Sequence, residues 1–210
     1  MGQGQGQGMK QIGIYGGSFD PIHIGHLNLA IAIKEAHGLD EVWLCPSSLN
    51  PNKLFGSREN AQHRLNMLHL AIEDIPWMHV TEVELDRPGP SYTIDTLKQL
   101  VDGYSGDRFS LILGDDSARD FHTWRQPDDI LNYAPLLVGR RSIDSKEAYQ
   151  GSAKVVNAIK KGLTLTPIME VASTQIRDRI SEGLYCGHLV PLKVLDYIIS
   201  NHLYSSPHVR

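Results

Sequence analysis

The chain has 210 residues, of which 41% are hydrophobic and 21% are charged, and its formal net charge is −4 at pH 7. This length and composition predict one domain with a single hydrophobic core, with room for a small helical appendage. A nonspecific nucleic-acid binder would carry a surplus of basic residues, so the acidic balance argues against that class and predicts no nucleic-acid partner.

The two cysteines, Cys45 and Cys186, stand far apart in no C-x-x-C arrangement. They predict neither a disulfide framework nor a zinc site, but two buried, inert thiols in a reducing compartment. No run reaches the roughly 18 apolar residues of a membrane span, and no signal segment opens the chain. We therefore expect a cytoplasmic protein without a membrane partner.

The amino terminus alternates glycine and glutamine, which cannot pack, and Met9 looks like a second start. These glycines make no dinucleotide fingerprint, because no strand precedes them. We expect a disordered leader over residues 1–9, a single domain over residues 10–204 and a tail over residues 205–210.

The stretch from Ile12 to His26 has the order strand, glycine turn, helix. We expect Gly16 and Gly17 to take positive φ angles and to let the backbone approach a ligand. The helix that follows points its N–H groups at the turn, an arrangement suited to phosphates. His23 and His26 share one face of its first turn. The simplest interpretation is two cations directed at one phosphate chain, although each feature taken alone is also common in α/β loops.

A β-α-β unit begins here. The apolar spacing predicts a helix from Ile24 to His37 that ends near Gly38, and a second strand from Val42 to Pro46. Strands joined in this way run parallel.

A loop over residues 47–57 follows the second strand, at the sheet edge where α/β proteins bind ligands. It carries Lys53, which either holds a phosphate as a point charge or is a solvated surface lysine. The next helix is expected from Arg58 to Ile72, with His63 and Arg64 on its more polar, outer faces.

A third strand is expected from Met78 to Leu85, followed by a helix that ends at Val101. Ser91 or Thr93 can cap this helix. Alternatively, the N–H groups at the helix start meet a polar part of a substrate.

The strand from Phe109 to Leu113 runs into Gly114, Asp115 and Asp116, so both carboxylates emerge at its carboxyl end. They can bind ribose hydroxyls, organise Mg²⁺ or cap the next helix. Trp124 follows on an irregular segment, where it is either a stacking surface for a planar ring or part of the core.

A further strand from Leu136 to Val138 ends at Arg140 and Arg141, two cations that favour phosphate contact. Residues 145–162 form an amphipathic helix or a variable insertion without assigned chemistry. The last strand is expected from Pro167 to Val171.

The next helix opens with Ser173 and Thr174, which are candidate caps. Arg177 lies about one turn further along, as a candidate second phosphate clamp. A closing apolar helix from Val190 to Leu203 is expected to pack against the core.

The segment Gly16 to His26, GGSFDPIHIGH, resembles the signature of the nucleotidyltransferase superfamily. Together with the loop lysine, SYTIDTL, GDD with the following Trp124, GRR and ASTQIR, it occurs in the order and spacing of the bacterial nicotinate mononucleotide adenylyltransferases. The resemblance covers about residues 10 to 204. It implies a Rossmann-like doubly wound parallel sheet, class α/β, with a small C-terminal helical part.

The resemblance implies adenylyl transfer from ATP to nicotinate mononucleotide, giving deamido-NAD and pyrophosphate, with Mg²⁺ bound mainly through the ATP phosphates. The implied catalytic residues are His23, His26 and Arg177. The implied ATP site also includes Gly16, Gly17, Ser18, Phe19, Lys53, Gly114, Asp116, Ser173 and Thr174. Thr93, Trp124, Arg125 and Arg141 would bind the acceptor, and no metal-ligating residues are implied.

Two positions depart from the family pattern. Asn52 stands where relatives often have a histidine, and Arg125 stands where an aromatic residue is common. Arg125 would place a cation near the pyridine carboxylate and so favour the acid over the amide.

Other classes remain alternatives. Adenylyl transfer to phosphopantetheine is disfavoured by SYTIDTL and Trp124, and a nucleotide sensor without turnover is disfavoured by the intact HIGH segment and Arg177. A class I aminoacyl-tRNA synthetase needs more than 210 residues. The oligomeric state is left open, a homo-oligomer included.

Overall fold

The computed structural model describes residues 8–48, 59–87, 89–140 and 148–205. Within these residues, six parallel strands form one sheet in the order β3-β2-β1-β4-β5-β6. The strands are β1 (Gln11–Gly17), β2 (Glu41–Pro46), β3 (Met78–Val80), β4 (Arg108–Gly114), β5 (Leu136–Arg140) and β6 (Leu163–Leu165). This strand order is that of a doubly wound Rossmann-like sheet, so the predicted fold class is confirmed.

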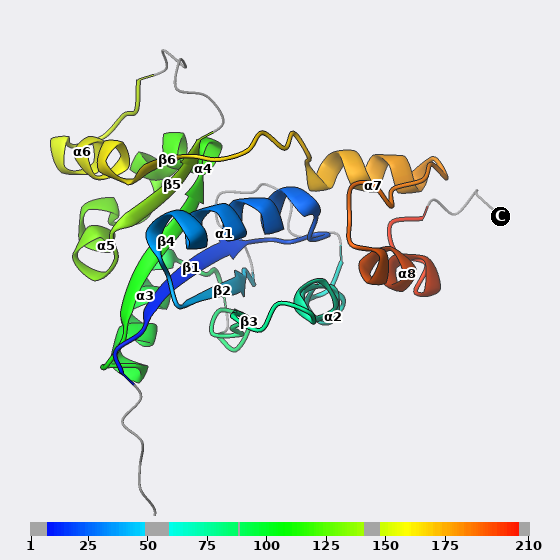
Figure 1. Ribbon diagram of the computed structural model, residues 1–210, viewed down its shortest axis with the longest axis horizontal. Helices are drawn as coiled ribbons and strands as arrows, with labels where there is room; N and C mark the ends of the chain where they lie inside the picture. Colours follow the sequence, from blue (N-terminus) through cyan, green and yellow to red (C-terminus); the bar gives the residue numbers. More distant parts are fainter. Residues whose placement is uncertain (1–7, 49–58, 88, 141–147, 206–210) are drawn as a thin grey trace, which may run out of the picture.

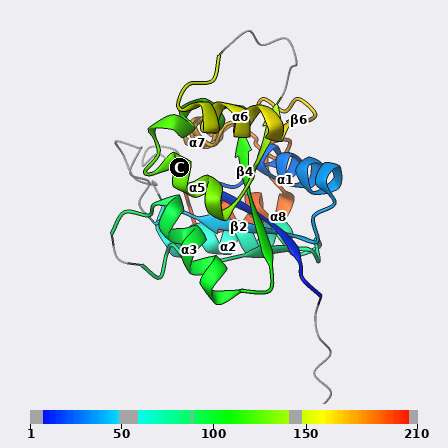
Figure 2. The ribbon, with the colours of Figure 1, turned by 90° about the vertical axis from the view of Figure 1, so that its left-hand side faces the viewer.

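Helices cover both faces of the sheet, and Figure 2 shows α1 and α3 on opposite sides of the strands. The helices are α1 (Ile24–His37), α2 (Ala61–Ile72), α3 (Thr93–Gly103), α4 (Asp115–Asp120), the 3-10 helix η1 (Phe121–Thr123), α5 (Pro127–Tyr133), α6 (Ala153–Gly162), α7 (Ser173–Ser181) and α8 (Leu192–Ser200). In the part of the chain that the structure describes, none of them is long and apolar enough to cross a membrane.

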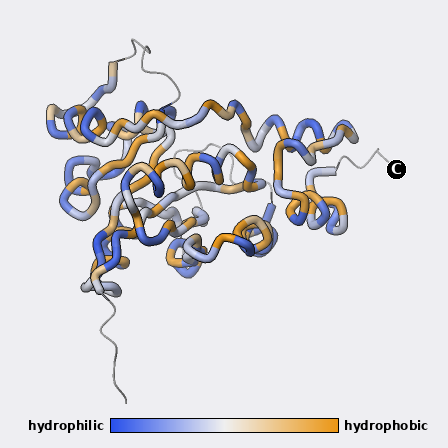
Figure 3. Tube along the Cα trace, viewed as in Figure 1, coloured by the Kyte–Doolittle hydropathy of each residue, from blue (hydrophilic) through white to orange (hydrophobic). Residues whose placement is uncertain are grey.

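Two hydrophobic cores lie on the two faces of the sheet. Ile12 and Ile14 of β1 pack into the core under α3, α5 and α6, whereas Tyr15 packs into the core that α1, α2, α7 and α8 share. Successive strand residues point to opposite faces, so one short apolar strand serves both cores. Figure 3 shows hydrophobic residues along α8 as well as α1, which agrees with the burial of Val194 and Ile198.

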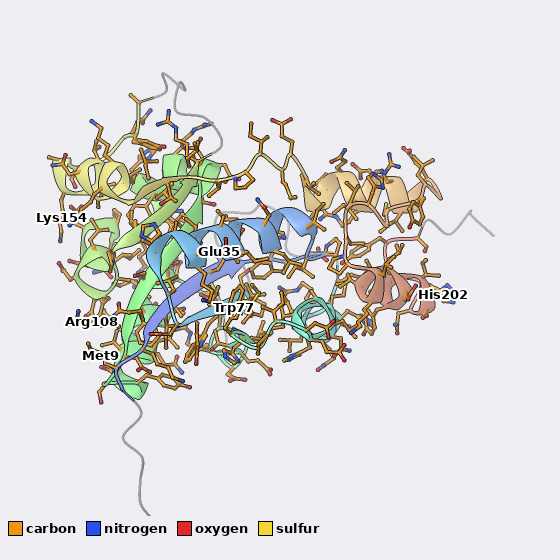
Figure 4. The ribbon with its side chains drawn as sticks, viewed as in Figure 1. Met9, Glu35, Trp77, Arg108, Lys154 and His202 are labelled. Carbon is orange, nitrogen blue, oxygen red and sulfur yellow. The ribbon has the colours of Figure 1, made fainter. Side chains whose placement is uncertain are left out.

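Helix α1 has the predicted bounds. It ends at Gly38, whose φ of 60° is in the left-handed region that glycine tolerates at a helix end. Helices α7 and α8 lie beyond the carboxyl end of β1 and form the C-terminal helical part (Figure 1). Figure 4 shows Met9 and Arg108 at the opposite end of the molecule from His202.

Two predicted strands are wrong in extent or place. The strand expected from Met78 to Leu85 stops at Val80, because the chain then turns, with the Leu85 N–H donating to the Glu82 carbonyl at 2.8 Å. The strand expected from Pro167 to Val171 is not formed. The edge strand is instead β6, directly after α6, because Leu163–Leu165 pairs with β5.

Three predicted helices begin later than expected. α2 begins at Ala61, after an Asn60 cap whose side chain accepts from the His63 N–H at 3.0 Å. α6 begins at Ala153, after a Ser152 cap that accepts from the Val155 N–H at 3.1 Å. The closing helix α8 spans only Leu192–Ser200. In the first two cases a side-chain cap sets the boundary more sharply than the apolar spacing does.

Candidate active site

Two adjacent cavities open at the carboxyl ends of the strands. The first, here the α3 cavity, has a volume of about 530 Å³ and is lined by β1, the start of α3 and residues 123–125. The second, here the α7 cavity, has a volume of about 620 Å³ and is lined by the starts of α1, α4 and α7. Both are lined by the same five residues, which therefore form the wall between them: Tyr15, Ser18, His26, Gly114 and Asp116. A ligand that fills both cavities therefore lies against this shared wall, which includes His26.

His23 and His26 form a reciprocal cap at the start of α1. His23 Nδ1 accepts from the His26 N–H, and His26 Nδ1 accepts from the His23 N–H, both at 3.3 Å. The two rings stack with centroids 3.6 Å apart. An Nδ1 that accepts a hydrogen bond carries no proton, so each neutral ring has its proton on Nε2. In this arrangement each ring can direct an Nε2–H donor away from the helix, and the interpretation of two cations directed at one phosphate chain stays a prediction.

Gly16 and Gly17 do not take the positive φ angles expected of them, because both are the last residues of β1. The positive φ falls on Phe19, at 47°. Both glycines line the α3 cavity rather than the α7 cavity. Phe19 is 1% exposed and lines neither cavity. Its ring packs edge-on against His26, with centroids 5.0 Å apart, so it supports the histidine from behind.

Arg64 lies in the interior, against the prediction that it belongs to a polar outer face of its helix. It is 2% exposed, and its Nη1 donates to the Ser18 carbonyl at 2.8 Å. Burial lowers the pKa of this guanidinium, although the nearby Asp20 carboxylate acts in the opposite direction. One signal was present in the sequence: Arg64 stands three and four residues before the buried Met67 and Leu68, and so shares their helix face.

The start of α7 contacts the loop before α1. Ser173 Oγ donates to the Pro21 carbonyl at 2.9 Å, and Arg177 donates from Nη1 to the Asp20 carbonyl at 2.7 Å and from Nη2 to Thr174 Oγ1 at 3.1 Å. Neither hydroxyl caps the helix, because the cap position is Ala172. Ser173, Thr174 and Arg177 all line the α7 cavity.

Thr93, Trp124 and Arg125 meet in the α3 cavity. Neither Ser91 nor Thr93 caps α3, because the cap position is Tyr92 and has no side-chain hydrogen bond. Trp124 is half-buried, with its ring centroid 5.2 Å from that of Phe121. It therefore belongs partly to the core and partly to the cavity wall.

The exposed Arg125 guanidinium is held at the cavity rim. It lies 4.6 Å from the centroid of the Tyr92 ring, and its Nη1 is 4.0 Å from a carboxylate oxygen of Asp95. This arrangement fixes a positive charge beside Thr93 and Trp124.

The two adjacent aspartates have different surroundings. Asp115 pairs with Arg119 and accepts from the Tyr149 hydroxyl at 2.7 Å. Burial, together with this carboxylate, raises the pKa of Tyr149 to about 12. Asp116 is exposed and lines both cavities next to Gly114. Asp116 is therefore the better placed of the two to meet a ligand.

Glu84 is a site residue that sequence reasoning missed. It lines the α3 cavity, is 8% exposed and accepts from Thr96 Oγ1 at 2.8 Å. Burial raises the pKa of its carboxyl. Cys45 lies beside it, and burial also raises the pKa of that thiol, which keeps it protonated. The expectation of buried cysteines is confirmed for both Cys45 and Cys186.

The structure does not describe every residue that the sequence analysis singled out. Asn52, Lys53 and Arg141 lie outside the described residues. In the described ranges, no group of three or more His, Cys, Asp or Glu side chains is placed to hold a metal ion.

The Rossmann-like sheet, with H-x-G-H at the start of α1 between two cavities, defines a nucleotidyltransferase. The sequence model of the family described as "Cytidylyltransferase-like" matches residues 14–179. The nicotinate-nucleotide adenylyltransferase of Bacillus subtilis (strain 168) is 36% identical over 199 residues, which cover 94% of this chain and all of that protein.

The fold is also that of two solved structures. These are the Plasmodium falciparum nicotinic acid mononucleotide adenylyltransferase in complex with NaAD, with a TM-score of 0.72, and the same protein in complex with APC, with a TM-score of 0.71. Each is 21% identical and covers 93% of this chain and 97% of its own. The chain belongs to the nicotinate-nucleotide adenylyltransferase family, whose enzymes act in NAD biosynthesis.

Proposed function

We propose that the chain transfers the adenylyl group of ATP to nicotinate mononucleotide, giving deamido-NAD and pyrophosphate. The observation that carries this proposal is the shared wall of the two cavities at His26. Deamido-NAD is two mononucleotides joined through their phosphates, so its two halves match two cavities that meet at a phosphate-binding helix start. Each volume is in the range of about 300–1,000 Å³ that small-molecule sites occupy.

The reaction is an in-line substitution at phosphorus. A phosphate oxygen of nicotinate mononucleotide forms a bond to the α-phosphorus of ATP, the bond from that phosphorus to the β-phosphate oxygen breaks, and pyrophosphate leaves with the electron pair. The acceptor phosphate has a second pKa of about 6 and is largely a dianion at pH 7, so the attack needs no general base. The protein's contribution is alignment of the reactants and stabilisation of the developing charge.

In this proposal, His26 donates from Nε2 to a phosphate oxygen in the transition state, and His23 and Arg177 contact the triphosphate with Lys53. Gly114 and Asp116 take the adenosine ribose, with Ser173 and Thr174 on the phosphates. Support comes from the positions of His26 in the wall that the two cavities share and of Arg177 in the lining of the α7 cavity.

The nicotinate half is assigned to Thr93, Trp124 and Arg125 of the α3 cavity. Trp124 stacks on the pyridine ring, and the Arg125 cation lies near its carboxylate. This half of the proposal rests on the half-buried indole and the rim position of the guanidinium.

Mg²⁺ is the proposed cofactor, bound mainly through phosphate oxygens of ATP. When bound, it neutralises charge on those oxygens. Asp116 supplies a carboxylate at the junction of the cavities, and oxygen is the ligand that Mg²⁺ prefers. ATP and nicotinate mononucleotide are the proposed partners, in the cytoplasm.

The test is pyrophosphate release with ATP and Mg²⁺, with nicotinate mononucleotide, nicotinamide mononucleotide and phosphopantetheine compared in parallel as acceptors. We expect a strong preference for nicotinate mononucleotide. Activity with phosphopantetheine alone would overturn the assignment of the α3 cavity. ATP binding without release of its pyrophosphate in the presence of any of these acceptors would identify a nucleotide sensor instead.

A further inference from the structure

A buried polar cluster lies beneath the loop that precedes α1 and is separate from both cavities. Its members are Asp20, Arg64 and Tyr204, which are 3%, 2% and 9% exposed. They come from the loop, from α2 and from the segment after α8, and none of them lines either cavity. Buried ionisable groups such as Asp20 and Arg64 are costly unless they are paired, so the partners of these groups are of interest.

The contacts of this cluster end on the two residues that flank Phe19. Arg64 Nη1 donates to the Ser18 carbonyl at 2.8 Å, and the Tyr204 hydroxyl donates to Asp20 Oδ1 at 2.7 Å. Burial, and next the Asp20 charge, raise the pKa of the Tyr204 phenol, which therefore keeps its proton and remains a donor. Arg177 adds a third donor from α7, to the Asp20 carbonyl at 2.7 Å.

Phe19 needs this support because its backbone is strained. Its φ of 47° is in the left-handed region, which is unfavourable for a bulky residue and persists only where the surroundings impose it. The conformation directs the Phe19 ring toward His26, with centroids 5.0 Å apart, and toward Tyr15, with centroids 5.5 Å apart. The loop thus connects the buried cluster to His26 through the ring of Phe19.

We propose that Tyr204 and Arg64 are positioning residues, which fix the Ser18–Asp20 backbone and through Phe19 set the place of the His26 imidazole. The segment after α8 thereby holds the loop that precedes α1 in place, although it lines neither cavity. This inference rests on the role proposed above for His26. It extends that role to Tyr204, whose hydrogen-bond partner Asp20 lies 184 positions earlier in the sequence.

The first test is Tyr204→Phe, which removes one hydroxyl and keeps the buried ring. The matched control is Tyr197→Phe. The Tyr197 hydroxyl joins the C-terminal part to α2, through His63 at 2.9 Å and Asn66 at 2.7 Å, whereas the Tyr204 hydroxyl joins it to the loop through Asp20. We expect Tyr204→Phe to lower kcat roughly tenfold with KM for ATP within about twofold, as displacement of a transition-state donor requires. Tyr197→Phe should leave kcat within about twofold.

The second test is a double-mutant cycle with His26→Asn. If Tyr204 acts through His26, Tyr204→Phe produces no further loss of kcat once the imidazole is absent. A tenfold loss in both backgrounds would show a general structural role and overturn the proposal, as would a loss equal to that in Tyr197→Phe. Where Tyr204→Phe unfolds at assay temperature, Arg64→Lys takes its place in the same cycle, with the same expected result.

A third readout does not depend on turnover. Histidine side-chain NMR, with the His26 signals assigned by their absence in His26→Asn, should show those signals shifted in Tyr204→Phe and unchanged in Tyr197→Phe, which should shift His63 instead. Unshifted His26 signals in Tyr204→Phe would overturn the proposal even if the activity fell. Failure of the proposed function would be recognised separately, as absence of pyrophosphate release by the unmodified protein.

Discussion

Replacement of His26 separates its chemical role from its role in the helix start. Its Nδ1 accepts the His23 N–H at 3.3 Å, and its Nε2 carries the proton that we assign to a phosphate oxygen. His26→Ala removes both functions. His26→Asn removes only the second, because the shorter side chain can place its amide oxygen near the position of Nδ1 but no donor near that of Nε2.

The two losses have different magnitudes. Removing one preorganised donor from a transition state costs about 2.7–4 kcal/mol, or roughly 100-fold to 1,000-fold in kcat. His26 is a half-buried single donor, which favours the lower end, roughly 100-fold, in both variants. Loss of a helix cap costs about 1 kcal/mol, which lowers Tm by roughly 2–4 °C in a protein of this size. Only His26→Ala should show that shift.

The assay is steady-state pyrophosphate release at saturating nicotinate mononucleotide and varied ATP, with thermal unfolding measured in parallel. We expect kcat to fall equally in the two variants with little change in KM for ATP. A loss confined to KM would mean that His26 binds the ground state. Near-normal kcat in His26→Asn would refute the role of Nε2, because the imidazole would then serve only the cap.

Three further outcomes are expected. Arg125→Ala should reduce the preference for nicotinate over nicotinamide mononucleotide, measured as a ratio of kcat/KM values. We expect a reduction of roughly twofold to fivefold, because the Arg125 guanidinium is exposed and an exposed ion pair is weak. An unchanged ratio would show that Arg125 does not determine acceptor preference. Because burial raises the pKa of Glu84, its contribution to stability is present at low pH and lost as pH rises through the raised value; Glu84→Gln should therefore raise Tm relative to the unmodified protein at pH 8 but not at pH 4, and an equal difference at both would contradict this. An added Cβ at Gly162 would lie 2.1 Å from the Leu136 carbonyl oxygen, so Gly162→Ala should lower the free energy of unfolding by about 2 kcal/mol or more, which is roughly 4–8 °C in Tm. The control is Gly103→Ala at the end of α3, where an added Cβ meets nothing within 4 Å, and it should leave Tm nearly unchanged.

Elements with local start and stop signals could be predicted from the sequence. Helix α1 is the clearest case, since the apolar spacing, the turn before His23 and the left-handed Gly38 all act within a few residues. The three-residue strands β3 and β6 could not be bounded in this way. Leu163–Leu165 is a strand because Thr164 pairs with Gly139 of β5, a contact that no pattern within the segment encodes.

The candidate site, too, has features that the sequence predicted and features that only the structure showed. The HxGH motif, the following helix start and the positions of Trp124 and Arg177 were visible in the sequence, because the chemistry depends on residue type and short spacing. Their binding roles stay predictions.

The sequence by itself therefore determined the family, the parallel sheet and the residues that carry the proposed chemistry. Only the tertiary structure decided which polar groups are buried and what they hold. Arg64 has the composition of a surface residue, yet it lies inside because α2 packs over the Ser18 carbonyl. Tyr204 meets Asp20 across 184 positions. Burial is a property of contacts between segments distant in the chain, so neither segment could reveal it alone.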